Sequence, residues 1–180
     1  MSERLTNSTT SLLIASQSAP QIALQFRLAI IGCGNPTRSD DGVGIEVIRL
    51  LALQAVPAGV QLIDAGTSGM EVMFKLRGAA RVVVVDACRS GHPPGAIFRL
   101  PARAAMTPAE HGFTLHGLRW DHALYAGVKI FGDGFVDHAE AILVEVQSLD
   151  YGMALSPPVQ AAAEQVVAIL AAMVDEHGRT

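Results

Sequence analysis

The sequence has few of the features that would indicate an unusual environment or a polyanionic partner. Its 180 residues include two cysteines, and aromatic residues make up 5% of the chain. No apolar run approaches the roughly 20 residues that a membrane-spanning helix needs. The formal net charge is -4 and no cluster of lysine and arginine occurs, which argues against nucleic acid or an acidic membrane as a partner. We therefore expect a soluble, cytoplasmic protein.

The apolar content is sufficient for one sizeable domain. Half of the residues are hydrophobic, and a chain of 180 residues can bury a real core. Residues 1–25 are rich in Ser, Thr, Gln and Ala and carry no convincing secretory signal, so we predict a flexible N-terminal extension followed by one domain at residues 26–180. Cys33 and Cys88 end β-prone runs and are expected to be reduced thiols. Metal ligation by this pair is a weaker interpretation.

The loop at residues 32–44 reads Gly-Cys-Gly-Asn-Pro-Thr-Arg-Ser-Asp-Asp-Gly-Val-Gly. Residues 26–31 before it are apolar and β-prone, and apolar residues return at helical spacing from Val43 onward, so the loop joins a strand to a helix. In an open α/β sheet, ligands bind beyond the carboxyl ends of the parallel strands. The loop is therefore a candidate binding site.

Two adjacent acids, Asp40 and Asp41, stand where the predicted helix begins. An aspartate at a helix start is most often a cap, and this interpretation accounts for one of the two without any function. A dinucleotide fits poorly, because Thr37 replaces the third glycine of its fingerprint and two carboxylates would repel a pyrophosphate. The acid pair favours a metal cation or a metal-bearing partner.

Two further carboxylates follow predicted strands. Asp64 ends the strand at residues 59–63, where it could accept N–H bonds in a turn or take a direct chemical role. In a dinucleotide enzyme, an acid at this point would hold the ribose. Asp86 ends Val82–Val85, a β-branched run typical of a strand covered on both faces. Parallel pairing would place Asp86 beside the first loop.

The second half of the chain is less regular. The link at residues 88–95 is short and rich in helix breakers, so residues 96–100 are predicted to return as an antiparallel edge strand. We predict a helix from Trp120 to near Gly127, a less buried strand at residues 141–149 and a last helix that starts at Ser156.

A histidine, His116, lies in a Thr-Leu-His-Gly-Leu segment that precedes the predicted helix at Trp120. A lone histidine in such a place is more often a packed or capping side chain than a metal ligand. His92, His111 and His122 lie in the same region of the sequence, and spacing alone does not choose among them.

Taken together, these motifs resemble the hydrogenase maturation endopeptidases that trim the large subunit of nickel–iron hydrogenases. The resemblance runs from about Phe26 to Met173, and the N-terminal extension lies outside it. It rests on the loop at residues 32–44, the turn Asp-Ala-Gly-Thr-Ser-Gly-Met at residues 64–70, the strand ending at Asp86 and the His-Gly-Leu segment. It implies one three-layer α/β domain with a twisted, mostly parallel five-stranded sheet, helices on both faces and one antiparallel edge strand.

The resemblance also implies an activity. The family, classed as aspartic-type endopeptidases, removes the C-terminal peptide of a nickel-loaded large-subunit precursor, which is the expected partner. The family's metal-binding and catalytic residues map onto Asp41, Asp86 and His116, and two carboxylates with one imidazole suit nickel as well as zinc. Asp40 and Asp64 are candidates to orient these ligands or tune their pKa. The nickel comes with the substrate, and no tightly bound cofactor is expected in the resting protein.

Two alternatives remain open. A nickel-binding chaperone without proteolysis would use the same ligands. A dinucleotide-binding oxidoreductase would need a phosphate-friendly first loop, which Asp40 and Asp41 oppose. For the endopeptidase, cleavage by a water that the metal polarises, or that one carboxylate activates, is the natural proposal.

Overall fold

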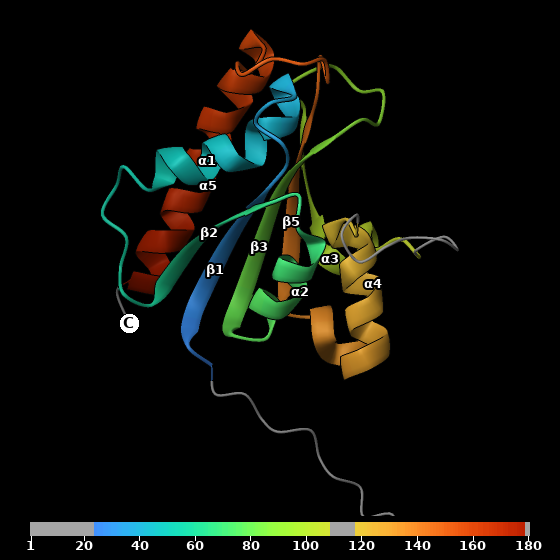
Figure 1. The fold of residues 1–180 in the computed structure, drawn as a ribbon. Helices are drawn as coiled ribbons and strands as arrows, with labels where there is room; N and C mark the ends of the chain where they lie inside the picture. The colour runs from blue at the N-terminus through green and yellow to red at the C-terminus, as the bar shows by residue number, and fades with distance from the viewer. Residues whose placement is uncertain (1–23, 109–117, 179–180) are drawn as a thin grey trace, which may run out of the picture.

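The fold is known from a computed structural model, which describes residues 24–108 and 118–178. The predicted N-terminal extension, up to residue 23, and His116 therefore lie outside the described residues. The described elements (Figure 1) are β1 (Phe26–Cys33), η1 (Ser39–Gly42), α1 (Val43–Leu51), β2 (Val60–Gly66), α2 (Gly69–Leu76), β3 (Ala79–Cys88), β4 (Ile97–Pro101), α3 (Ala102–Ala105), α4 (Trp120–Phe131), η3 (Asp133–Val136), β5 (Ala139–Glu145) and α5 (Pro157–Gly178).

The five strands form one sheet in the order β2-β1-β3-β5-β4. All neighbouring strands are parallel except β4, which runs antiparallel to β5 at the edge. The prediction of a mostly parallel five-stranded sheet with one antiparallel edge strand is confirmed. From β1 the chain goes outward to β2 on one side and then crosses to β3 on the other. The carboxyl ends of β1 and β3 therefore mark the point where the winding reverses, which is where such sheets bind ligands.

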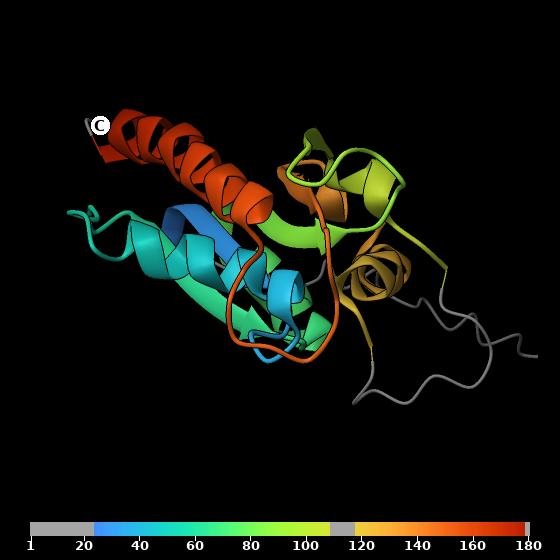
Figure 2. The ribbon, with the colours of Figure 1, turned by 90° about the horizontal axis from the view of Figure 1, so that it is seen from above.

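Helices cover both faces of the sheet, so the domain has three layers. Figures 1 and 2 show α1 and α5 on one face and α2 and α4 on the other. Along β3, Val83 and Val85 enter the core beneath α1 and α5, whereas Val82 and Val84 enter the opposite core. Because side chains alternate along a strand, two covered faces require a continuous apolar run. This explains the β-branched sequence of β3.

One described helix, α5, is long and apolar enough to cross a membrane by length and composition alone. It packs on the sheet, and Val159, Val166 and Leu170 are fully buried in the core that it shares with α1. Its apolar residues therefore have partners within the domain, as expected of a core helix. The predicted start after Ser156 is confirmed.

Some predicted boundaries are wrong. The strands predicted to end at Asp64 and Asp86 each continue two residues further, to Gly66 and Cys88. The α4 helix continues past Gly127 to Phe131, because Gly127 is a packing position: a Cβ there would lie 2.3 Å from the ring of Phe135. The helix ends instead at Gly132, whose φ of +97° favours glycine. The last strand, β5, spans Ala139–Glu145 and is mostly buried rather than partly exposed, because it pairs with β3 and β4 on its two sides.

Candidate functional site

Glycines bring the first loop onto the ends of β1 and β3. A Cβ added to Gly44, at the start of α1, would lie 2.3 Å from the carbonyl oxygen of Cys33 and 2.4 Å from that of Val85. One added to Gly34, whose φ is +125°, would lie 1.8 Å from the carbonyl oxygen of Asp41. Side chains are excluded at both positions, so the loop lies directly against the strand ends. The glycines thus fix Asp41 at the switch point of the sheet.

Asp40 holds η1 in place through hydrogen bonds. It is fully buried in η1 and accepts four hydrogen bonds, from the backbone N–H groups of Gln147, Ser148 and Ser156 and from the Ser156 hydroxyl, at 2.6–2.9 Å. Burial by itself raises the pKa of this carboxyl, but the hydrogen bonds outweigh burial and hold the pKa below its ordinary value. Asp40 therefore ties η1 to the segment between β5 and α5.

Asp41 has a different environment from its neighbour. It is half-buried and accepts one backbone hydrogen bond, from Asn35 to Oδ2 at 3.1 Å. Its side chain faces a cavity of about 140 Å³ at the carboxyl ends of the strands. The residues that line this cavity are Cys33, Gly34, Asp41, Gly66, Thr67, Ser68, Gly69, Asp86, Arg119 and Trp120.

Asp86 reaches the same cavity from the end of β3. It is 8% exposed, and the indole N–H of Trp120 donates a hydrogen bond of 2.7 Å to Oδ2. Burial raises the pKa of Asp86 to about 6, although the Trp120 hydrogen bond and the positive charge of Arg119 oppose the rise. The nearby Asp41 carboxylate adds to the rise. Asp86 is thus a carboxyl that titrates close to neutral pH.

Asp64 does not line the cavity. Its exposed side chain accepts the backbone N–H of Gly66 at 2.9 Å and so shapes the turn after β2. The turn-forming interpretation is confirmed, although the residue is exposed rather than buried. Ser68 caps α2 by accepting the backbone N–H of Glu71.

The segment after His116 lies at the cavity. The carbonyl of Leu118 accepts the N–H of Gly69 at 3.0 Å, and Arg119 and Trp120 line the wall. Of the competing histidines, His92 and His122 are described and neither lines this cavity, while residue 111 lies outside the described residues.

Two residues of the site were missed by the sequence reasoning. Trp120 was assigned only to a helix, and Arg119 was not singled out, yet both contribute to the pKa of Asp86. Both residues directly follow the His-Gly-Leu segment, and this position indicates that they lie near the site. The indole N–H of a buried tryptophan also needs a partner, which pointed to a polar group nearby.

The two cysteines are free thiols. Cys33 lines the cavity, where burial, and after it the Asp86 carboxylate, raise the pKa of the thiol well above its ordinary value. Because a thiolate is the form that binds metal, a protonated thiol is a poor ligand. Among residues 24–108 and 118–178, no three His, Cys, Asp or Glu side chains group closely enough to hold a metal ion. Asp41 and Asp86 by themselves therefore do not make up a metal site among the described residues.

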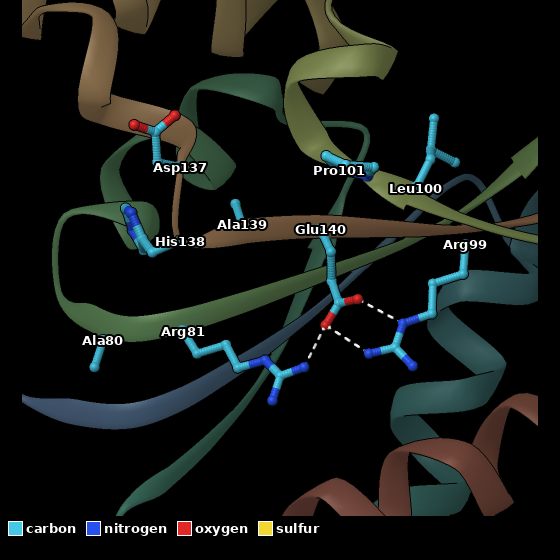
Figure 3. A pocket seen from close by; sticks show the side chains of 9 residues that line it. All are labelled: Ala80, Arg81, Arg99, Leu100, Pro101, Asp137, His138, Ala139 and Glu140. Atoms are coloured by element: carbon cyan, nitrogen blue, oxygen red, sulfur yellow. Dashed lines mark hydrogen bonds and ion pairs between the residues drawn. The ribbon is translucent and has the colours of Figure 1, made fainter.

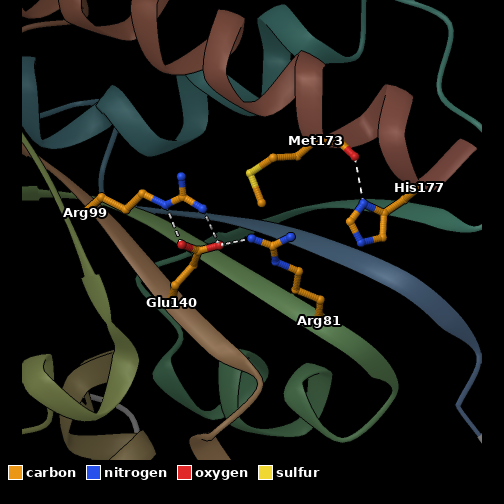
Figure 4. Close-up of polar contacts among 5 residues, drawn as sticks. All are labelled: Arg81, Arg99, Glu140, Met173 and His177. Carbon is orange, nitrogen blue, oxygen red and sulfur yellow. Dashed lines mark hydrogen bonds and ion pairs between the residues drawn. The ribbon is translucent and has the colours of Figure 1, made fainter.

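A larger hollow, of about 650 Å³, lies at the opposite end of the strands (Figure 3). Glu140 is its central charge, and it accepts hydrogen bonds from Arg81 at 2.9 Å and from Arg99 at 2.5 and 3.1 Å (Figures 3 and 4). Above these residues, the ring of His177 donates to the carbonyl of Met173 within α5. The charged side chains here are paired with one another, and the pKa of Glu140 is lowered because the arginine hydrogen bonds outweigh burial.

Comparisons with known proteins point to one family. A sequence profile of the HycI family, described as hydrogenase maturation protease, matches residues 45–173. The hydrogenase expression/formation protein HupM of Azotobacter chroococcum mcd 1 is 30% identical over 158 residues, which cover 84% of this chain and 73% of that protein. The hydrogenase 2 maturation protease of Escherichia coli (strain K12) is 26% identical over 81% of this chain and 91% of its own length.

Other relatives are matched over a smaller part of their length. The chain spans 60% of a relative from Methanocaldococcus jannaschii, at 32% identity, and 34% of the HupD protein of Rhodobacter capsulatus, at 35% identity. Activity, substrate and partner therefore need an argument of their own.

Solved structures agree on the fold. The hydrogenase maturating endopeptidase HybD from E. coli aligns with a TM-score of 0.70 at 23% identity, over 85% of this chain and 94% of that one. The maturation protease HycI from Thermococcus kodakarensis KOD1 aligns with a TM-score of 0.66 at 22% identity, over 83% and 92% of the two chains. At these identities the likeness concerns the fold alone. The profile match over most of the domain goes further: this chain belongs to the hydrogenase maturation protease family.

Proposed function

We propose that the protein is an endopeptidase that removes the C-terminal peptide of a nickel-loaded nickel–iron hydrogenase large-subunit precursor. The observation that carries the proposal is the meeting of Asp41, from η1 in the loop after β1, and Asp86, from β3, in one cavity at the switch point of the sheet. Family membership supports the reaction class, since the matching profile is that of hydrogenase maturation proteases.

Nickel enters this proposal as part of the substrate. Asp41 and Asp86 offer carboxylate oxygens to the ion, and His116 offers an imidazole nitrogen. His116 precedes Leu118 by two residues, a distance of at most about 7 Å along an extended chain, and the carbonyl of Leu118 is hydrogen-bonded at the cavity. Three such ligands leave positions that the precursor's own metal ligands fill. A precursor without nickel would lack this contact and be rejected.

The chemistry needs a water molecule activated near the peptide bond. We assign Asp86 as the carboxylate that accepts a proton from it, because Asp86 is the more buried of the two; its pKa of about 6 belongs to the site without nickel, and the cation lowers it. The substrate's nickel would polarise the same water or the peptide carbonyl. Trp120 and Arg119 then act as positioning residues that keep Asp86 oriented and partly ionised.

The remaining assignments follow from the same proposal. No resident cofactor is needed, because the metal arrives with the precursor. Asp40 and Asp64 support the site through the backbone: Asp40 anchors η1 and Asp64 shapes the turn before α2. The partner is the precursor protein, and cleavage takes place in the compartment where nickel is inserted, which we propose is the cytoplasm.

Incubation of the purified protein with nickel-loaded and nickel-free precursor tests the proposal. Mass spectrometry should show loss of the C-terminal peptide in the loaded sample alone. Association without any change in mass would support the chaperone alternative instead. Tight binding of NAD in a calorimetric titration would support the oxidoreductase.

A further inference from the structure

The segment between β5 and α5, residues 146–156, displays two apolar side chains to solvent. Tyr151 is 93% exposed and Met153 is 78% exposed, the highest values among the large hydrophobic residues that the structure describes. Single exposed apolar residues are common on protein surfaces. Here two of them lie on either side of Gly152 in one connection between a strand and a helix.

Hydrogen bonds fasten this segment along its length. Besides the contacts of Asp40 at both ends, the guanidinium of Arg38 donates to the carbonyl of Leu149 at 3.0 and 3.2 Å. The N–H of Ser39 donates to Gly152 at 2.8 Å, and the N–H of Gly152 donates to Thr37 at 3.0 Å. The backbone is therefore held just before Tyr151, at residues 147–150, and at Gly152, which precedes Met153.

The fastening partners, residues 37–40, directly precede Asp41. Figure 2 shows the segment, in orange, passing around η1, the short helix that carries Asp41. Met153 also borders a groove of about 300 Å³ whose apolar wall includes Pro36 and Ile45. The ion pair of Glu46 and Arg49, at 2.6 Å, lies at this groove as well. The groove is therefore lined by both apolar and charged residues, and protein interfaces contain both kinds.

The site cavity is too small to select a protein by itself. Its volume is about 140 Å³, whereas pockets that enclose a drug-sized ligand measure roughly 300–1,000 Å³. A protease with this cavity can hold a metal ion and the atoms around one peptide bond. Recognition of a whole folded substrate must then come from a surface outside the cavity. The surface of Tyr151 and Met153 is held rigidly to the loop of Asp41, which makes it suitable for this task.

We infer that Tyr151 and Met153 form a docking surface for the body of the precursor protein, which offers them an apolar depression. This inference rests on the proposed function, since it supplies the partner of the same site. Tyr and Met are enriched in the cores of protein interfaces, where a few buried anchors carry most of the affinity. Because the anchors are fixed to residues 37–40, docking places the precursor's metal at Asp41 without reordering the segment.

The experiment compares the double variant Tyr151→Ser/Met153→Ser with the matched control Leu53→Ser/Ile130→Ser. The control removes apolar side chains that are 75% and 65% exposed in the connection after α1 and in α4. For nickel-loaded precursor, we expect the docking variant to raise KM by about tenfold or more while kcat at saturation stays within about twofold. Calorimetric binding to the precursor should weaken in parallel, and the control should match the wild type.

Each other outcome has one meaning. An unchanged KM and unchanged binding in the docking variant would overturn the inference while leaving the proposed function intact. Binding by the wild type without cleavage, lost in the variant, would keep the docking surface but remove the protease. A wild-type protein that neither binds nor cleaves the precursor would overturn both. A dimer in sedimentation that the docking variant converts to monomer would assign the surface to a second copy of this chain and overturn the inference.

Discussion

The carboxylates at the two ends of the sheet differ in their neighbours: one is paired with arginines, and the other lies near a second carboxylate. At one end, the hollow of about 650 Å³ contains Glu140 between Arg81 and Arg99, and the charges satisfy one another. At the other end, the much smaller cavity of about 140 Å³ is lined by Asp86 and Asp41, and the charge of Asp41 raises the pKa of the buried Asp86 further. Glu140 thus has two arginine partners at the larger hollow, whereas the two carboxylates of the smaller cavity have one arginine, Arg119, in the cavity wall.

This difference shows why we place the proposed active site in the smaller cavity rather than in the larger hollow. An ionised Asp86 is costly for the fold, because its pKa of about 6 lies above the ordinary value of 3.8. The difference corresponds to about 3 kcal/mol at neutral pH. A protein tolerates such a cost where function needs it. A bound cation would relieve the cost, whereas nothing at the Glu140 end needs relief.

The strongest test of the comparison exchanges one carboxylate for an amide at each end. Asp86→Asn should reduce kcat/KM for nickel-loaded precursor by on the order of a thousandfold, because it removes a metal ligand and the proposed base. Glu140→Gln, the matched change at the opposite end, should leave kcat/KM within about twofold. Equal losses in the two variants would remove the functional distinction between the ends.

The same Asp86→Asn variant should be more stable than the wild type at neutral pH. Because the folded-state pKa of Asp86 is raised, its ionised form destabilises the fold above about pH 6, and the cost disappears as the pH falls below about 4. We expect the free energy of unfolding to rise by up to about 3 kcal/mol at pH 8 and to change little at pH 4. Urea titrations at both pH values measure this, and a variant less stable than the wild type at pH 8 would contradict it.

The Trp120→Phe variant tests whether Asp86 controls the pH dependence of activity. The pH profile of kcat/KM should show an acidic limb near pH 6, where Asp86 ionises. Trp120→Phe removes the hydrogen bond that opposes the rise of the Asp86 pKa, so the limb should move to higher pH and activity at pH 6 should fall about two- to fivefold. At pH 8 the variant should approach wild-type activity, and a limb that does not move would count against Asp86 as the titrating group.

The smallest expected effect belongs to the ion pairs at the opposite end. Glu140→Gln should lower the free energy of unfolding by about 1 kcal/mol, because its arginine partners are partly exposed and such pairs contribute little. The loss should shrink in high salt. Thermal unfolding at low and high ionic strength checks this. A loss of several kcal/mol would contradict the expectation that these partly exposed ion pairs contribute little to stability.

Local patterns in the sequence predicted most of the fold. The β-branched run Val82–Val85 is typical of a strand covered on both faces, and the breakers at residues 88–95 predict the antiparallel return of β4; the structure has both. Asp86 was placed correctly because the carboxyl ends of parallel strands meet at one edge. These conclusions needed only neighbours in the sequence and the general rules of sheet winding.

Long-range contacts decided what the sequence did not reveal. Asp40 and Asp41 are adjacent in the sequence and have the same side chain. Asp40 binds backbone groups more than a hundred residues away, whereas Asp41 lines the cavity. The hydrogen bond of Trp120 to Asp86 and the packing of Gly127 against Phe135 likewise depend on how α4 lies on the sheet. Such contacts do not follow from the hydrophobic periodicity that predicts helices and strands.

We propose that Asp41 and Asp86 accept a nickel ion that another protein presents. The most direct measurement is the nickel K-edge absorption spectrum of nickel-loaded precursor, alone and mixed with the wild-type protein or with Asp86→Asn. We predict that the wild type adds oxygen ligands to the spectrum before the C-terminal peptide is lost, and that Asp86→Asn does neither. An unchanged nickel spectrum in a mixture that nevertheless cleaves the precursor would contradict the account.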